Sequence, residues 1–133
     1  MFRYKPITKR SIIKTKYLYH LTSRDNLEEI KKSGILKGRQ PSSIARLMMA
    51  LSTQYKSDVR QIYFFRSLKR TFGARKNAEV CIKISAGNSV VQQLLTSALH
   101  RKIDNAIILE TEFLDLSAMC CAYSISSELL QIL

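Results

Sequence analysis

The chain has 133 residues, of which 46% are hydrophobic, so length and composition suit one folded domain and exclude a disordered chain. It has no run of 18 apolar residues and no apolar stretch near its start, so we expect neither a membrane span nor a signal peptide. The formal net charge is +12, and residues 1–76 hold 19 of the 22 Lys and Arg residues but four of the ten acids. This basic first half predicts a surface that faces a polyanion, and an odd number of cysteines, three, favours a reducing, cytoplasmic site of action.

The first elements follow in chain order from residue 1. Residues 1–16 read as a basic arm or a short edge strand, and the aromatic and apolar residues at 17–21 predict a strand. A helix is expected at 25–33, with Asp25 as its N-cap and Gly34 as its left-handed stop. The apolar side of this helix is expected to consist of Leu27, Ile30 and Ile35.

The remaining elements are read from hydrophobic periodicity. Strands are expected at 61–65, 79–84, 106–113 and 119–125. Helices are expected at 42–54, 67–71 and 90–101, the last of them capped by Ser89. This order does not alternate regularly, so it predicts an α+β fold with two small, mostly antiparallel sheets. The chain also lacks a Gly-x-Gly-x-x-Gly or Walker motif, so any nucleotide site must come from another architecture.

One segment carries a specific resemblance. Its strand and helix match the opening motif of the ADP-ribosyltransferase superfamily at Tyr19, His20, Thr22, Ser23, Asn26, Leu27, Ile30 and Gly34. The segment Gln-Ile-Tyr-Phe-Phe-Arg-Ser around Tyr63 is similar to the second motif of the same family. The resemblance implies that His20, with Thr22 or Ser23, binds the nicotinamide and ribose of NAD, and that Tyr63 stacks on the nicotinamide.

The resemblance also implies a glutamate that stabilises positive charge on the ribose as nicotinamide leaves. The predicted strand at 106–113 offers Glu110 and Glu112 on one face, two residues apart. Glu112 fits better, because an apolar pair and the closing strand follow it, as in DNA-modifying bacterial toxins of the superfamily. Glu110 remains the alternative.

Arginines that could hold the NAD pyrophosphate by bidentate hydrogen bonds are abundant, and the sequence does not choose among Arg24, Arg46, Arg60 and Arg66. A denser basic cluster with Phe72 inside it predicts a nucleic-acid patch, made of Lys69, Arg70, Arg75 and Lys76. The spacing of cysteines and histidines provides no zinc motif, so we expect no metal.

The resemblance implies a compact domain over residues 17–133, after the arm at 1–16, with split antiparallel sheets and flanking helices. It implies a toxin or effector of the His-Tyr-Glu type that cleaves NAD and transfers ADP-ribose to a macromolecule. The basic first half favours a nucleic-acid acceptor slightly over a protein, and favours an acidic antitoxin or immunity protein as a partner. Two alternatives stay open: a metal-independent ribonuclease toxin that uses His20 and the basic surface, and a nucleic-acid-binding module without catalysis.

Overall fold

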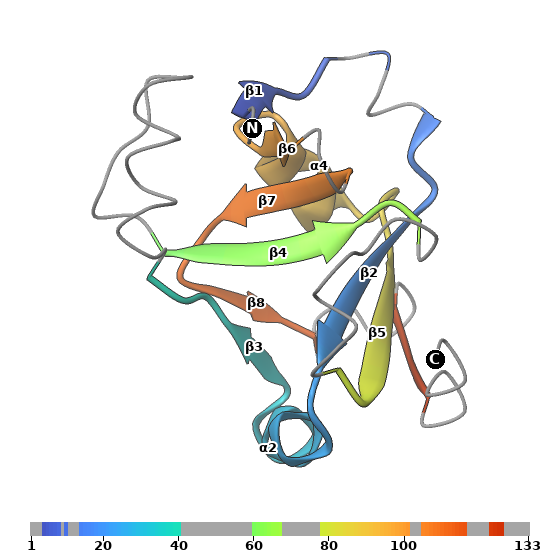
Figure 1. The fold of residues 1–133 in the computed structure, drawn as a ribbon, viewed down its shortest axis with the longest axis vertical. Coiled ribbons are helices and arrows are strands. Elements are labelled where there is room, and N and C mark those ends of the chain that lie inside the picture. Colours follow the sequence, from blue (N-terminus) through green and yellow to red (C-terminus); the bar gives the residue numbers. More distant parts are fainter. Residues whose placement is uncertain are drawn as a thin grey trace.

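The computed structural model of the chain describes residues 4–8, 10, 14–40, 60–67, 78–101, 105–116 and 123–126. Two sheets and two helices account for most of this part of the chain (Figure 1). The helices are α2 (Arg24–Ser33) and α4 (Ser89–Leu95). The strands are β1 (Tyr4–Pro6), β2 (Tyr17–Thr22), β3 (Ile35–Lys37), β4 (Gln61–Phe65), β5 (Val80–Ser85), β6 (Leu99–Arg101), β7 (Ala106–Glu110), β8 (Phe113–Asp115) and β9 (Tyr123–Ser126).

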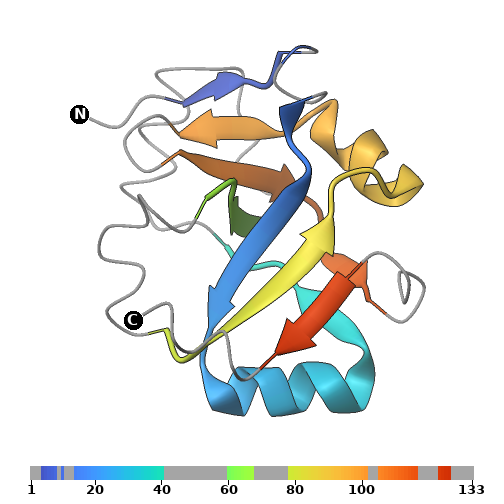
Figure 2. The same ribbon diagram turned by 90° about the vertical axis from the view of Figure 1, so that its right-hand side faces the viewer.

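The larger sheet has seven strands in the order β1-β6-β7-β4-β2-β5-β9, and β3 and β8 form the second sheet. Each described pairing is antiparallel. The expected α+β class with antiparallel sheets is therefore confirmed, although one sheet is larger than the sequence suggested. Helix α2 lies across the ends of β2 and β5 (Figure 2).

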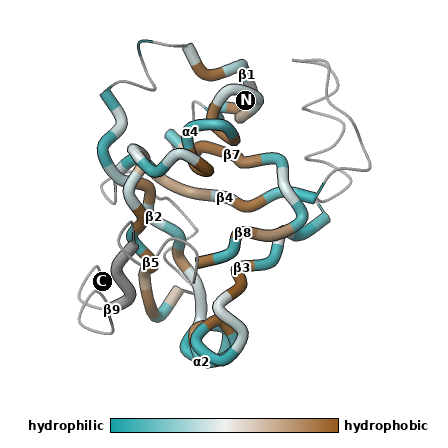
Figure 3. The backbone as a smooth tube through the Cα atoms, turned by 180° about the vertical axis from the view of Figure 1, so that it is seen from behind, coloured by the Kyte–Doolittle hydropathy of each residue, from teal (hydrophilic) through white to brown (hydrophobic). Residues whose placement is uncertain are grey.

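One hydrophobic core joins the large sheet to the elements around it. Leu18, Phe64 and Ile82 are fully buried on β2, β4 and β5, and alternation along each strand places them on one face. Leu27 of α2 and Leu95 of α4 pack into the same core. Figure 3 shows the hydrophobic stretches along β4, β5 and β7 that supply it. Burying this apolar surface is the main favourable contribution to the stability of such a domain.

Helix α2 follows the sequence pattern except at its start. Ser23, and not Asp25, is the N-cap, because the Ser23 hydroxyl oxygen accepts a hydrogen bond from the backbone N–H of Asn26 at 3.2 Å. Gly34 ends the helix as expected, with φ 71°, and its N–H donates to the Ile30 carbonyl. The assignment of Ile35 to the helix face is wrong, since Ile35 begins β3.

Two expectations for the second half of the chain need correction. The helix predicted at 90–101 begins with Asn88 as its N-cap, not Ser89, and stops at Leu95. Residues 99–101 instead form β6, which pairs with both β1 and β7. The hydroxyl of Thr96 donates to the Gln93 carbonyl at 2.7 Å and so competes with a further helical turn.

The strand predicted at 106–113 is interrupted. β7 ends at Glu110, and the chain passes to β8 in the second sheet, so Glu110 and Glu112 do not share a strand face. The break is fixed by two hydrogen bonds, from the Thr111 hydroxyl to the Phe113 carbonyl and from the Gly38 N–H to the Glu112 carbonyl.

Some of the other expected elements are confirmed as strands, and the rest lie mostly outside the described residues. The strands predicted at 17–21, 61–65 and 79–84 are confirmed to within one residue at each end, and residues 4–6 form the short edge strand. The helix at 42–54, most of the segments at 67–71 and 119–125, and the chain after residue 126 lie outside the described residues.

Candidate active-site cleft

The cleft forms where β2 and β4 diverge. The two strands are paired only between Tyr19 and Phe65, whereas β2 pairs with β5 along its whole length. At the other end of β4, Gln61 pairs with Arg39 through two backbone hydrogen bonds of 2.8 and 2.9 Å. Between these points lies a cleft of about 960 Å³, bounded by β2, one side of α2, β3 and the chain that follows it, and β4.

His20 bridges the diverging strands. Its Nδ1 lies 2.7 Å from the carbonyl oxygen of Tyr63, and its ring lies against Phe64 with centroids 5.5 Å apart. A carbonyl can only accept, so Nδ1 carries the proton and donates it. Burial lowers the pKa of His20 from its ordinary value, and the charge of Arg39 lowers it further, while the hydrogen bond to Tyr63 opposes them. The ring is therefore neutral near pH 7, and its Nε2 is a hydrogen-bond acceptor.

Tyr63 brings an aromatic ring to the same cleft. Its side chain is half-buried, and the guanidinium of Arg101 on β6 lies 5.2 Å from the ring centroid. This distance is within the range of a cation–π interaction. Arg101 thus joins the cleft from a strand that is distant in sequence, and no motif in the chain pointed to it.

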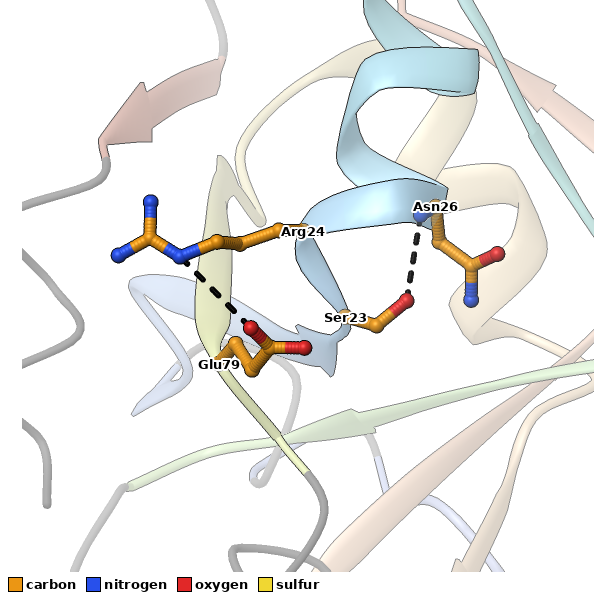
Figure 4. Close-up of polar contacts among 4 residues, drawn as sticks. All are labelled: Ser23, Arg24, Asn26 and Glu79. Carbon is orange, nitrogen blue, oxygen red and sulfur yellow. Dashed lines mark hydrogen bonds and ion pairs between the residues drawn. The ribbon is translucent and has the colours of Figure 1, made fainter.

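The turn between β2 and α2 forms another wall. Thr22, Ser23 and Asn26, which all belong to the first motif, line the cleft. Figure 4 shows that the Ser23 hydroxyl caps the helix through Asn26. Arg24 points elsewhere, since its Nε lies 3.7 Å from the carboxylate of Glu79 in an exposed ion pair.

The cleft has a basic lining. Four cationic residues and one acid are found among the described residues that line it: Lys37, Arg39, Arg60, Arg101 and Glu29. Nη1 of Arg60 donates to the Gly38 carbonyl at 3.2 Å, which fixes the guanidinium beside the chain that follows β3. The sequence included Arg60 among many arginines but gave no reason to select Arg39, because its position depends on the bridge to Gln61.

The two candidate glutamates lie next to the cleft and not among the described residues that line it. Glu110 is half-buried at the end of β7, directly opposite Gln61, which is a lining residue. Glu112 is exposed, and its backbone carbonyl accepts from the N–H of Gly38, another lining residue, at 2.6 Å. Glu110 thus lies on the strand next to β4, and Glu112 lies in the turn between β7 and β8, beside Gly38.

Other predicted site residues lie apart from the cleft. Arg66 lines a separate cavity of about 100 Å³ together with Lys5 and His100. The basic cluster at 69–76 and Arg46 lie outside the described residues. Cys81 is buried in the core, and burial raises the pKa of its thiol to about 11, so it remains a protonated thiol at neutral pH.

Within the described residues, His, Cys, Asp and Glu side chains form no group of three that could hold a metal ion. In the same part of the chain, neither helix has the length and apolarity needed to cross a membrane. The chain matches no model of a known protein family, no curated protein and no solved structure. Its function is therefore inferred from the geometry of the cleft.

Proposed function

We propose that the protein is an NAD-dependent ADP-ribosyltransferase that binds NAD in the cleft between β2 and β4. The observation that carries this proposal is the His20–Tyr63 pair. A neutral imidazole with an acceptor nitrogen and an aromatic ring from two different motifs line one basic cleft. The sequence resemblance assigned NAD contacts to the same two residues.

The size and charge of the cleft support this proposal. Its volume of about 960 Å³ lies near the upper end of the range for small-molecule sites, roughly 300–1,000 Å³, which suits a dinucleotide. Arg39 and Arg60 are the residues that we expect to hold the pyrophosphate, because both line the cleft and guanidinium groups bind phosphate oxygens in pairs. Nε2 of His20 is suited to accept a hydrogen bond from a ribose hydroxyl.

The chemistry is the cleavage of one C–N bond. The bond between ribose C1′ and the nicotinamide nitrogen breaks, the nitrogen keeps the electron pair, and a nucleophile on the acceptor forms the new bond to C1′ and loses its proton. Tyr63 would position the nicotinamide by offset stacking. A carboxylate would stabilise the positive charge that develops on the ribose. Glu112 and Glu110 are the carboxylates implied by the resemblance, and Glu29 is the one that lines the cleft.

We propose a macromolecular acceptor, with nucleic acid slightly favoured over protein because the first 76 residues carry most of the positive charge. The same charge favours an acidic antitoxin or immunity protein as a partner. A ribonuclease toxin would also use His20, as a base toward an RNA hydroxyl, and it would need no NAD.

The test is release of nicotinamide from NAD by the purified chain, alone and with DNA, RNA or cell lysate. His20→Asn is the sharpest variant, because the asparagine amide can still donate to the Tyr63 carbonyl while the acceptor Nε2 is lost. We expect this variant, and one of Glu112→Gln, Glu110→Gln and Glu29→Gln, to lose activity by about two orders of magnitude. Lys31→Gln, on the exposed last turn of α2, is the control and should retain activity.

Absence of nicotinamide release in every mixture would overturn the proposal. RNA degradation without NAD that is lost in His20→Asn would replace it with the ribonuclease. Release that survives in His20→Asn would show that the His20–Tyr63 pair is not the site.

A further inference from the structure

The outer face of the small sheet continues from the wall of the cleft. Figure 1 shows its strands β3 and β8 side by side, and Leu36 is paired with Leu114 and Lys37 with Phe113. Leu36 and Leu114 are buried in the core. Because side chains alternate along a strand, Lys37 and Phe113 stand together on the opposite, exposed face. Lys37 also lines the cleft, so this face begins where the cleft wall ends.

Phe113 is held outward by the strand register. It is the most exposed large hydrophobic side chain in the described part of the chain, at 53%. The Thr111 hydroxyl donates to the Phe113 carbonyl at 3.0 Å, and the Gly38 N–H donates to the adjacent Glu112 carbonyl at 2.6 Å. A shift of one residue that buried the ring would expose Leu114. The fold therefore fixes an aromatic ring on the surface, and its neighbours decide what it can bind.

The end of this face that is nearer the cleft is cationic. Directly opposite residues have Cβ atoms about 5 Å apart, so the Lys37 ammonium can reach a group that lies against the Phe113 ring. Arg39, two residues further along, is also exposed and lines the cleft. Asp115, on the same face, is opposite Ile35 at the end nearer α2. A ligand on Phe113 therefore meets positive charge in the direction of the cleft.

An aromatic ring next to cations is suited to single-stranded nucleic acid. The ring stacks on an unpaired base, and the cations contact phosphates of the backbone. The bases of a duplex are already stacked inside the helix and cannot use the ring in this way. An acidic protein segment would match the cations, but it has no flat π-face that requires an exposed aromatic ring.

We propose that Lys37 and Phe113 form a docking surface for a single-stranded nucleic acid that leads into the cleft. Phe113 stacks on one base, Lys37 contacts a neighbouring phosphate, and the strand continues towards Arg39. Glu112, a candidate catalytic carboxylate, immediately precedes Phe113, so an acceptor nucleotide docked here lies close to it. Transfer of ADP-ribose to this strand rests on the proposed function, whereas binding of the strand does not require NAD.

The first experiment measures binding without NAD. Fluorescence anisotropy follows a labelled single-stranded oligonucleotide of mixed sequence, made as DNA and as RNA. We expect Phe113→Ala to bind at least about fivefold more weakly than the wild type, and Phe113→Tyr, which keeps the ring, to bind like the wild type. Tyr17→Ala is the matched control, because Tyr17 is a 44% exposed aromatic residue on β2 that does not line the cleft. Thermal unfolding checks that each variant is folded.

The second experiment tests the charge and the strandedness. Lys37→Gln should reduce the slope of log affinity against log salt concentration by about 0.7, the value for one phosphate contact with a single strand. Lys32→Gln removes the same charge from the exposed last turn of α2 and should leave the slope nearly unchanged. A duplex of the same sequence should bind Phe113→Ala and the wild type equally.

Equal binding of the single strand by Phe113→Ala and the wild type would overturn the docking surface. Polyglutamate binding with the same loss in Phe113→Ala would also overturn it, and would indicate an acidic protein on this face. Nicotinamide release is measured separately with the same oligonucleotide. Strand binding that depends on Phe113 without nicotinamide release would overturn the proposed function alone. Nicotinamide release without strand binding would overturn the docking surface alone.

Discussion

The two long edges of β4 are paired in different ways. On the β7 side, all five residues of β4 face a partner, from the pair Gln61–Glu110 to the pair Phe65–Ala106. On the other side, β4 is paired only at its ends, by Arg39 and by Tyr19 of β2. The complete edge is part of the core, and the interrupted edge forms the wall of the cleft.

The difference shows how one strand can serve both stability and a site. A complete ladder satisfies every backbone group along the edge and buries the side chains on it. An interrupted ladder leaves backbone groups that need other partners, and here His20 provides one by donating to the Tyr63 carbonyl. His20, a residue of the candidate site, therefore also supplies a hydrogen bond that the sheet lacks at this edge.

The largest effect on stability is expected from a substitution in the core along the fully paired edge between β4 and β7. Leu109 of β7 is fully buried, lies in the core and faces Ile62 of β4. Leu109→Ala should lower the free energy of unfolding by about 2–5 kcal/mol, from lost burial and the cavity left behind. Urea denaturation measures this, and Val90→Ala, at a position on α4 that is 44% exposed, should change it by less than about 0.5 kcal/mol. A similar loss in both variants would contradict the view that the β7 edge carries the stability.

A smaller effect is expected at Gly38, which precedes the bridge between Arg39 and Gln61 at one end of the interrupted edge. A Cβ at Gly38 would overlap the backbone carbonyl of Thr111, and the Gly38 N–H donates to Glu112. Gly38→Ala should destabilise the protein by about 1–3 kcal/mol and weaken the proposed binding of NAD, because Arg39 and Arg60 are both held at this segment. Gly87→Ala is the control, since its nearest neighbour would be the Ser85 hydroxyl at an ordinary 3.5 Å. Equal effects of the two substitutions on thermal unfolding would show that the close approach is unimportant.

The sequence predicts the elements well where local chemistry decides them. The alternation and aromatic content around Tyr63 predicted β4, and Gly34 marked the end of α2. Helix α4 was predicted too long because the apolar residues at the end of the predicted segment fit the buried face of a helix and of a strand equally well. Only pairing with β1 and β7, which are far away in sequence, assigns residues 99–101 to β6.

For the candidate site, the sequence pointed to residues that belong to local motifs. It did not point to residues that reach the cleft only through the pairing and order of the strands. The cleft is lined by four residues that belong to the two motifs: His20, Thr22, Ser23 and Tyr63. Arg39 and Arg101 were missed because one depends on an isolated bridge to Gln61 and the other on strand order. The face shared by Glu110 and Glu112 was wrong because a hydrogen bond to Gly38, 74 residues before Glu112, ends the strand between them.

The smallest effect is expected at His20, whose hydrogen bond to Tyr63 joins β2 and β4 in the middle of the interrupted edge. The pKa of His20 is lower in the folded chain than its ordinary value of 6.5, because burial disfavours the charged ring. The unfolded chain therefore binds the proton more readily, and the stability that depends on the neutral ring is present above about pH 6.5 and is lost as the pH falls through the lowered pKa. His20→Asn removes this titration and keeps a donor to the Tyr63 carbonyl, while His20→Ala removes both.

At pH 7.5 we expect His20→Ala to cost about 1 kcal/mol, from the lost hydrogen bond, and His20→Asn to cost less. Between pH 7.5 and 5, the wild-type chain should lose stability relative to both variants, since only in the wild type does the unfolded chain bind a proton at residue 20 more readily than the folded chain does. Thermal unfolding across this pH range measures the difference. Parallel pH curves for all three chains would mean that folding does not lower the pKa of His20, and would remove the support for the neutral acceptor on which the proposed NAD contact depends.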